Sequence, residues 1–339
     1  MENTEKTYAN VKIGKPKDAV IEIEGEVSAE ILETHRINAL AEVRKEINIP
    51  GFRKGTAPEK LVLQHIRMDA VLTDAAEAAL SEAYPDILHD HKIEPMSSPR
   101  VSITKLAQGN PLGFTIRVAV EPEVGLPNYK KITRAAKEKH PAVEVTEKDV
   151  EDVVAQLLAM RPAKEGEKAE LTDEFVKTLG KFETVAEFKE KLKDNIKEEK
   201  TMEARRALYE VFAKDLIAGT ELTLPTLLVE DGAEAAHRRF HAELEKRKIS
   251  EEDYLARIKK TKEEFRKEER ETVERQLKTK FVLKAIAAKE NIVADEKDIE
   301  AEMKHATSHH QNVDLERFRS YISEMLVNEK TLKFLEELK

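Results

Sequence analysis

One short stretch of the chain gathers cations and an aromatic side chain in a way that suits binding. It runs from Gly51 to Pro58 with the sequence GFRKGTAP, and Phe52, Arg53 and Lys54 are adjacent in it. Residues 44–60 contain five Lys or Arg residues and two Glu residues, so this stretch has a net charge of +3, whereas the whole chain has a net charge of -9. An arginine fork binds phosphate or carboxylate, and an exposed Phe supplies an apolar anchor. The alternative interpretation is a solvated hairpin loop with Phe52 folded back against a helix.

No comparable set of residues indicates catalysis or a metal site. The chain has no cysteine, so it has no disulfide and no thiolate ligand. It contains no G-x-S-x-G, P-loop, G-x-G-x-x-G or H-E-x-x-H motif. His305, His309 and His310 include an i, i+4 pair but lack an obvious third ligand. We therefore predict no catalytic residues, no metal and no cofactor.

Length and composition indicate a multi-unit, highly charged protein. The 339 residues exceed what one hydrophobic core usually organises, and 37% of them are charged while only 5% are aromatic. With 11 Gly and 12 Pro, long helices are favoured over turn-rich β architecture. No signal peptide and no membrane span are recognisable, so we expect a cytoplasmic protein without a membrane partner.

The first third has the pattern of helices on a small antiparallel sheet. Ile21 and Ile23 alternate with Glu residues as in a half-buried strand, and Ser28 has the position of a helix N-cap. Thr56 and Glu59 have capping-box spacing for a second helix. An alanine-rich stripe over 72–87 predicts a third helix, and strands are expected near 101–103 and 114–120. We predict an α+β domain over residues 1–133.

The remainder has the pattern of an all-α region. A lysine-rich stretch then leads into an extended segment at Pro141, and residues 134–145 are predicted to form a linker. From residue 146 to residue 339 helical spacing dominates, with breaks expected near Ser250, Asn291 and Asn312. Between 243 and 280 the apolar stripe is thin, which predicts an elongated domain with projecting arms.

The stretch from Gly51 to Pro58 resembles the ribosome-docking signature G-F-R-x-G-x-x-P of the trigger factor family. The segments Glu121–Val124 and Leu171–Gly180 are also similar to that family. The resemblance implies an ATP-independent chaperone that docks at the ribosomal exit tunnel and shields nascent polypeptides. Its partners would be the large ribosomal subunit, through ribosomal protein and RNA, and unfolded chains. Self-association of the free protein into a homodimer is left open.

Carried over by position, the resemblance implies roles for named residues. The ribosome contact would be formed by Gly51, Phe52, Arg53, Lys54, Gly55 and Pro58. Apolar residues of the helical region are candidates for client binding, with intramolecular packing as the alternative for each of them. They are Phe175, Leu179, Phe182, Leu224, Leu227, Leu228, Tyr321, Met325 and Leu326.

The sequence departs from the family in one respect. Most members insert an FK506-binding-type prolyl isomerase, whereas residues 145–174 contain no Phe, Tyr or Trp and have the pattern of one helix plus a polar break. We therefore predict that the isomerase domain is absent and that the chain is not an enzyme. Three alternatives are a ribosome-assembly or RNA-binding factor without client holding, a periplasmic-type chaperone and a vestigial isomerase.

Overall fold

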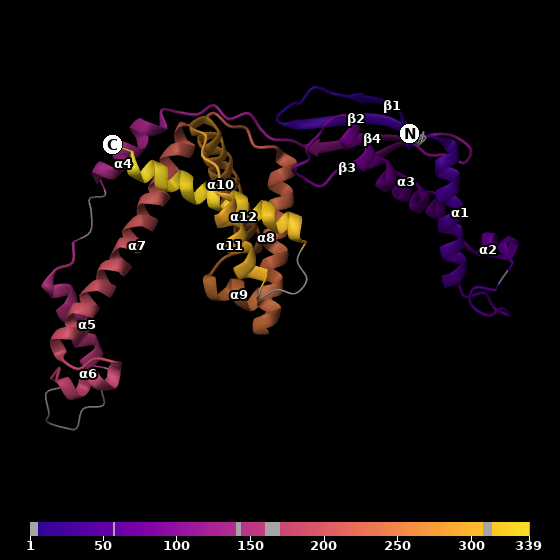
Figure 1. Cartoon of the computed structure of the whole chain (residues 1–339). Helices are drawn as coiled ribbons and strands as arrows, with labels where there is room; N and C mark the ends of the chain where they lie inside the picture. The colour runs from indigo at the N-terminus through magenta and orange to yellow at the C-terminus, as the bar shows by residue number, and fades with distance from the viewer. Residues whose placement is uncertain (1–5, 57, 140–143, 160–169, 308–313, 339) are drawn as a thin grey trace. The chain divides into compact units, whose positions relative to one another are not determined.

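The structure, a computed structural model, describes residues 6–56, 58–139, 144–159, 170–307 and 314–338. By its internal contacts the chain forms two compact units, each built from two separate segments (Figure 1). The first unit comprises residues 1–124 and 222–278, and the second comprises residues 125–221 and 279–339. The chain thus leaves the first unit after residue 124 and forms the larger segment of the second unit. It returns to the first unit at residue 222 and completes the second unit from residue 279.

A four-stranded antiparallel sheet forms the centre of the first unit. Its strands are β1 (Ala9–Ile13), β2 (Val20–Val27), β3 (Arg100–Lys105) and β4 (Leu112–Ala119), in the order β1-β2-β4-β3. Along β2 the buried residues alternate with exposed ones, and eight successive pairs join it to β4. This confirms the small antiparallel sheet that the alternating pattern predicted. The edge strand β1 was not predicted.

Helices α1 (Ala29–Glu46) and α3 (Met68–Asp90) pack on this sheet. Ser28 caps α1 as predicted, because its Oγ accepts a hydrogen bond from the backbone N–H of Ile31 at 3.3 Å. Four alanines of α3, Ala75, Ala76, Ala79 and Ala83, are completely buried, which allows this face of the helix to approach the strands closely. The resulting core includes Ile23, Val27, Ala75, Ala79, Ala83, Ile87, Leu112, Phe114 and Ile116.

A second segment of the chain completes the first unit. It contains α8 (Thr226–Arg247), α9 (Glu251–Ile258) and the part of α10 (Lys262–Glu290) that ends at residue 278. Asp231 of α8 accepts hydrogen bonds from the backbone N–H of Ser98 at 2.6 Å and from the Arg100 guanidinium at 2.8 Å. These bonds attach α8 to the sheet, so residues 222–278 group with the N-terminal segment rather than with the other helices.

The second unit is helical. It consists of α4 (Tyr129–Lys139), α5 (Glu147–Ala159), α6 (Asp173–Leu179), α7 (Val185–Gly219), the end of α10, α11 (Glu296–Thr307) and α12 (Leu315–Glu337). Its core includes Phe212, Leu216, Phe281, Ile286 and Leu335. Half of the segment expected to be a linker, residues 134–145, differs from the prediction, since residues 134–139 belong to α4. Ala136 is buried there, and Lys137 Nζ donates to the carbonyl of Glu336 at 2.6 Å.

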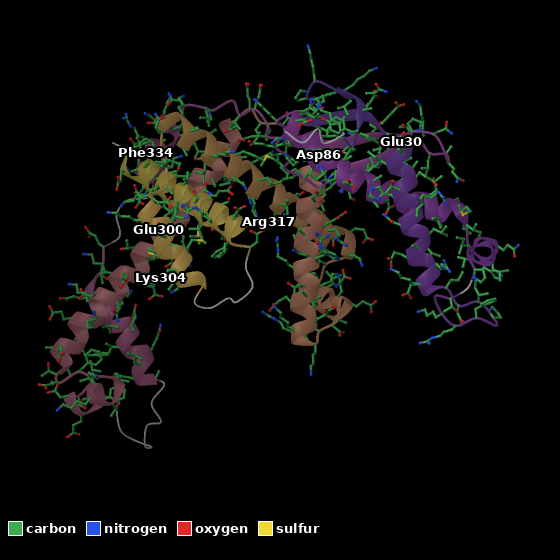
Figure 2. The ribbon with its side chains drawn as sticks, turned by 45° about the vertical axis from the view of Figure 1, so that its right-hand side comes forward. Glu30, Asp86, Glu300, Lys304, Arg317 and Phe334 are labelled. Carbon is green, nitrogen blue, oxygen red and sulfur yellow. The ribbon has the colours of Figure 1, made fainter. Side chains whose placement is uncertain are left out.

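The helices carry charged side chains over most of their exposed faces. Figure 2 shows examples along the chain, including Glu30 of α1 and Lys304 of α11. Among the described residues, no helix combines the length and the apolar character needed to cross a bilayer.

Candidate functional site

The cationic stretch forms a tight loop between α1 and α2 (Glu59–His65), and two successive turns build it. The backbone N–H of Phe52 donates to the carbonyl of Ile49 at 3.1 Å, and that of Thr56 donates to the carbonyl of Arg53 at 2.9 Å. Gly51 and Gly55 occupy the third position of each turn, with φ of 88° and 81°. A type II turn requires such a positive φ at this position, where glycine carries no steric penalty. The two glycines therefore set the path of the loop.

The base of this loop is packed, although its tip is open. Ile49 is buried, and a small separate core holds it against the end of α1, α2 and the start of α3. That core consists of Leu40, Ile49, Val62 and Val71, with Val43, Ile47, Leu61 and Ile66 partly buried around it. The tip beyond Ile49 is thus presented from a fixed support.

Phe52 is exposed at the tip of the loop. Its side chain has 40% of its surface accessible and is not part of the core beneath the loop. Arg53 is also exposed, and its guanidinium forms no ion pair or hydrogen bond with any side chain that the structure describes. Phe52 therefore does not enter the core beneath the loop.

Lys54 differs from Arg53 because it has an intramolecular partner. Its Nζ lies 2.9 Å from Oε2 of Glu46, the last residue of α1. The hydrogen bond from Lys54 holds the pKa of the Glu46 carboxyl below its usual range. Arg53 is thus the cation of the tip whose charge is least compensated.

The predicted capping box at Thr56 was wrong. Helix α2 begins at Glu59 after Pro58, and no side chain caps it. Thr56 instead closes the second turn, because its Oγ1 donates to the carbonyl of Arg53 at 2.7 Å. The hydroxyl therefore bonds within the turn, and it accepts no hydrogen bond from the backbone of α2.

The candidate client residues fall into three groups by exposure. Leu179, Tyr321 and Met325 are exposed. Phe175, Phe182, Leu224 and Leu228 are partly buried. Leu227 and Leu326 are buried, so client contact at these two is not supported, and they serve intramolecular packing instead. Leu326 packs with Ile299 and Ile322 between α11 and α12.

A cluster of potential ligand side chains that was not predicted from the sequence lies in the first unit. His237 and His241 on α8 and Glu251 on α9 place one potential ligand atom each within 4.8 Å of one another. The available signal was the i, i+4 spacing of the two histidines, which puts both rings on one face of α8. Of the histidines considered from the sequence, His305 lies on α11, while His309 and His310 lie outside the described residues.

Comparison with known proteins gives two family matches along the chain. The family model described as bacterial trigger factor protein matches residues 9–157, and the model of the trigger factor C-terminus matches residues 184–337. The trigger factor of Carboxydothermus hydrogenoformans is 27% identical, over 94% of this chain and 96% of that protein. The trigger factor of Moorella thermoacetica is 25% identical, over 83% of this chain and 82% of that protein.

A solved structure supports the same fold. It comes from work on promiscuous substrate recognition in folding and assembly activities of the trigger factor chaperone. Its TM-score is 0.56 at 18% identity, with 97% of this chain and 100% of that chain covered.

The chain is also shorter than the trigger factor of Carboxydothermus hydrogenoformans. The alignment with the Carboxydothermus protein runs over 414 positions, whereas this chain has 339 residues, so at least 75 positions of that relative have no counterpart. Between the two matched regions lie only residues 158–183.

Proposed function

Because this chain belongs to the trigger factor family of chaperones, we propose that it docks at the exit tunnel of the large ribosomal subunit and shields emerging polypeptides without ATP. The loop from Gly51 to Pro58 would be the attachment point. A protein that works there acts in the cytoplasm, which agrees with the expectation from the sequence.

The exposure of Phe52 beside Arg53 is the observation that carries this proposal. Phe52 leaves 40% of its surface in solvent and does not belong to the core beneath the loop, so this apolar area is available to a partner. Placed next to an uncompensated guanidinium, Phe52 can enter an apolar pocket of a partner while the Arg fork binds phosphate or carboxylate. The packed base and the two glycine turns reduce the ordering cost of binding.

Client holding is supported by apolar surface in the second unit. Besides Leu179, Tyr321 and Met325, the exposed large apolar residues there include Met202, Val293 and Leu315. An apolar cavity of about 240 Å³ is lined by Tyr209, Phe212, Leu216, Val282, Leu283 and Leu332, among others. Scattered apolar patches of this kind favour weak, multivalent contacts with unfolded chains of many sequences.

We further propose that the chain has no prolyl isomerase activity. Residues 158–183, between the two matched family regions, are too few for a β-rich domain with an enclosed pocket. Shielding of clients would then depend on the helical surfaces alone.

A ribosome-assembly or RNA-binding factor is the second candidate function. The cationic tip favours it, since the tip also fits RNA phosphate. The net charge of -9 and the confinement of the basic cluster to one loop argue against an extended RNA interface.

Co-sedimentation with large ribosomal subunits tests the docking proposal. Wild type should pellet with the subunits, whereas the triple variant Phe52→Ala, Arg53→Ala, Lys54→Ala should stay in the supernatant. A matched control removes two exposed Lys and one exposed apolar residue from β1 and the residues after it. That control, Lys12→Ala, Ile13→Ala, Lys15→Ala, should pellet like wild type. Equal pelleting of wild type and the loop variant would refute the proposal.

A further inference from the structure

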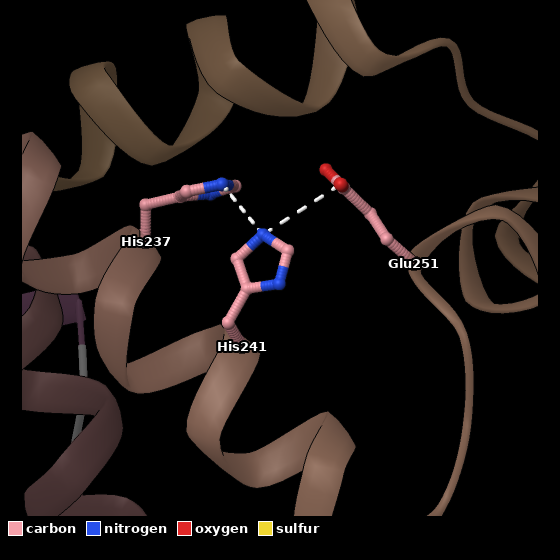
Figure 3. A group of neighbouring side chains, drawn as sticks. All are labelled: His237, His241 and Glu251. Atoms are coloured by element: carbon pink, nitrogen blue, oxygen red, sulfur yellow. Dashed lines mark hydrogen bonds and ion pairs between the residues drawn. The ribbon is translucent and has the colours of Figure 1, made fainter. Parts of the chain in front are cut away.

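Two consecutive elements of the first unit direct three ligand-type side chains at one point. His237 and His241 project from α8, and Glu251 projects from the start of α9 (Figure 3). The Nε2 atoms of the two histidines are 2.8 Å apart, and His241 Nε2 is 3.6 Å from Oε2 of Glu251. Two imidazoles and a carboxylate form a donor set typical of divalent transition-metal sites.

Glu269 of α10 fixes the orientation of the His237 ring. Its Oε2 lies 3.1 Å from Nδ1 of His237, and both side chains are largely buried. An ionised carboxylate can only accept, so Nδ1 is the protonated nitrogen. In the neutral ring the lone pair then lies on Nε2, the atom that faces His241 and Glu251. A carboxylate behind a histidine in this way is the usual second shell of a metal-binding imidazole.

One carboxylate oxygen of Glu251 has no hydrogen-bond partner among the described residues. Oε1 is buried and makes no hydrogen bond there. Oε2 pairs with Lys262 Nζ at 3.1 Å. Oε1 thus has no partner among the described residues, and such a buried polar atom is costly unless a ligand satisfies it.

We propose that His237, His241 and Glu251 bind a divalent transition-metal ion, with Zn²⁺ as the probe ion. Zn–N bonds of about 2.0–2.1 Å in a tetrahedral site place the ligand atoms roughly 3.3 Å apart. The present distances of 2.8 Å and 3.6 Å are close to this value, so small rotations of the side chains bring the ligand atoms to tetrahedral positions. Three protein ligands leave the fourth position to water or another donor. Through Glu251 and Glu269, the ion connects α8 to α9 and, indirectly, to α10.

Zinc titration of the full chain without an affinity tag tests the site. In competition with a chromophoric chelator, wild type should bind one equivalent of Zn²⁺. The single variants His241→Asn and Glu251→Gln should each weaken this binding at least tenfold. Glu269→Gln should weaken it by about 10–100-fold through the orientation of His237, although it removes no ligand.

Matched controls separate this site from surface histidines. His89→Asn changes an exposed histidine of α3, and the pair His309→Ala, His310→Ala removes two histidines outside the described residues. Both controls should bind Zn²⁺ like wild type. A loss of binding in the His309, His310 pair, with Glu251→Gln unaffected, would overturn the proposal.

A stability readout covers the case in which a variant folds poorly. Zn²⁺ binds the folded chain, so it should raise the Tm of wild type and slow amide exchange in α9. It should do neither in Glu251→Gln, whose circular dichroism without metal is expected to match wild type. If wild type takes up no Zn²⁺, or if His241→Asn and Glu251→Gln bind it as wild type does, the site does not exist.

Discussion

Lys54 at the loop tip is bonded to Glu46 at the end of α1, with Nζ and Oε2 2.9 Å apart. This ion pair connects the second turn of the loop to the helix that supports it. It also compensates the charge of Lys54 and leaves Arg53 as the principal cation of the tip. Both partners are exposed, so the pair shapes the electrostatics of the loop more than the stability of the fold.

Glu46→Gln should therefore strengthen ribosome binding. The substitution releases Lys54 and raises the net charge of residues 44–60 from +3 to +4. We expect affinity to rise about two- to fivefold at low salt and to approach the wild-type value at high salt, because exposed charges are screened. Binding measured at several salt concentrations checks this, with the exposed Glu94→Gln as control. Unchanged affinity at low salt would contradict the role of the pair.

The same pair has a defined pH dependence. The pKa of Glu46 is lowered in the folded chain. The contribution of the pair to the stability of the fold is therefore fully present at pH values above the pKa of Glu in the unfolded chain, about 4.3. The contribution is lost as the pH falls through the lower folded pKa. Near neutral pH the loop tip therefore keeps this link.

Gly51→Ala should damage docking through backbone conformation alone. No atom lies within 4 Å of a Cβ at this position, but φ of 88° disfavours any L side chain by about 1–2 kcal/mol. Ribosome affinity should fall roughly tenfold, and Gly51→Asn should be milder because Asn tolerates positive φ better. Gly109 has φ of 75° and equally open surroundings in another turn, so Gly109→Ala is the matched control. If both alanine variants bind as wild type does, the turn geometry is not needed.

The sequence predicted those parts of the fold in which local pattern and burial agree. Alternation around Ile21 and Ile23, the Ser28 cap and the alanine stripe of α3 each reflect one element whose face is buried. The grouping of residues 222–278 with the sheet was not predictable in this way. It depends on contacts such as that between Asp231 and Arg100, which are 131 residues apart and leave no periodic signal.

The candidate site shows the same division. The composition of the loop from Gly51 to Pro58 and its position between two helices were visible in the sequence, and the exposure of Phe52 agrees with them. The pairing of Lys54 with Glu46 required coordinates, because residues 44–60 contain two Glu residues, Glu46 and Glu59, and the sequence does not say which of them Lys54 contacts. Thr56 was misassigned because its hydroxyl can serve either a turn or a helix cap.

Client holding should depend on exposed rather than buried apolar residues. The triple variant Leu179→Ala, Tyr321→Ala, Met325→Ala should suppress aggregation of a refolding substrate at least twofold less well, with little change in Tm. Leu326→Ala is the contrasting change, since it removes a buried side chain and should lower the free energy of unfolding by about 2–5 kcal/mol. Light scattering and thermal unfolding measure the two effects. Full suppression by the triple variant would exclude these residues from client contact.

Prolyl isomerisation should not be catalysed by this chain. Residues 158–183 cannot hold the missing domain, so the isomerisation rate of a proline-containing peptide should stay at the uncatalysed value at every protein concentration. An isomerase of the FK506-binding type, added at the same concentration, serves as the positive control. A rate that rises in proportion to the concentration of this chain would show that activity resides elsewhere in it.

Site-specific crosslinking from position 52 tests the docking loop most directly. In one variant, photoreactive benzoylphenylalanine replaces Phe52. In a second variant it replaces Val293, a residue of the second unit that is 71% exposed. On illumination with large ribosomal subunits, position 52 should crosslink to ribosomal protein or RNA and position 293 should not. Absence of crosslinks from position 52, under conditions in which the same variant pellets with ribosomes, would contradict docking through this loop.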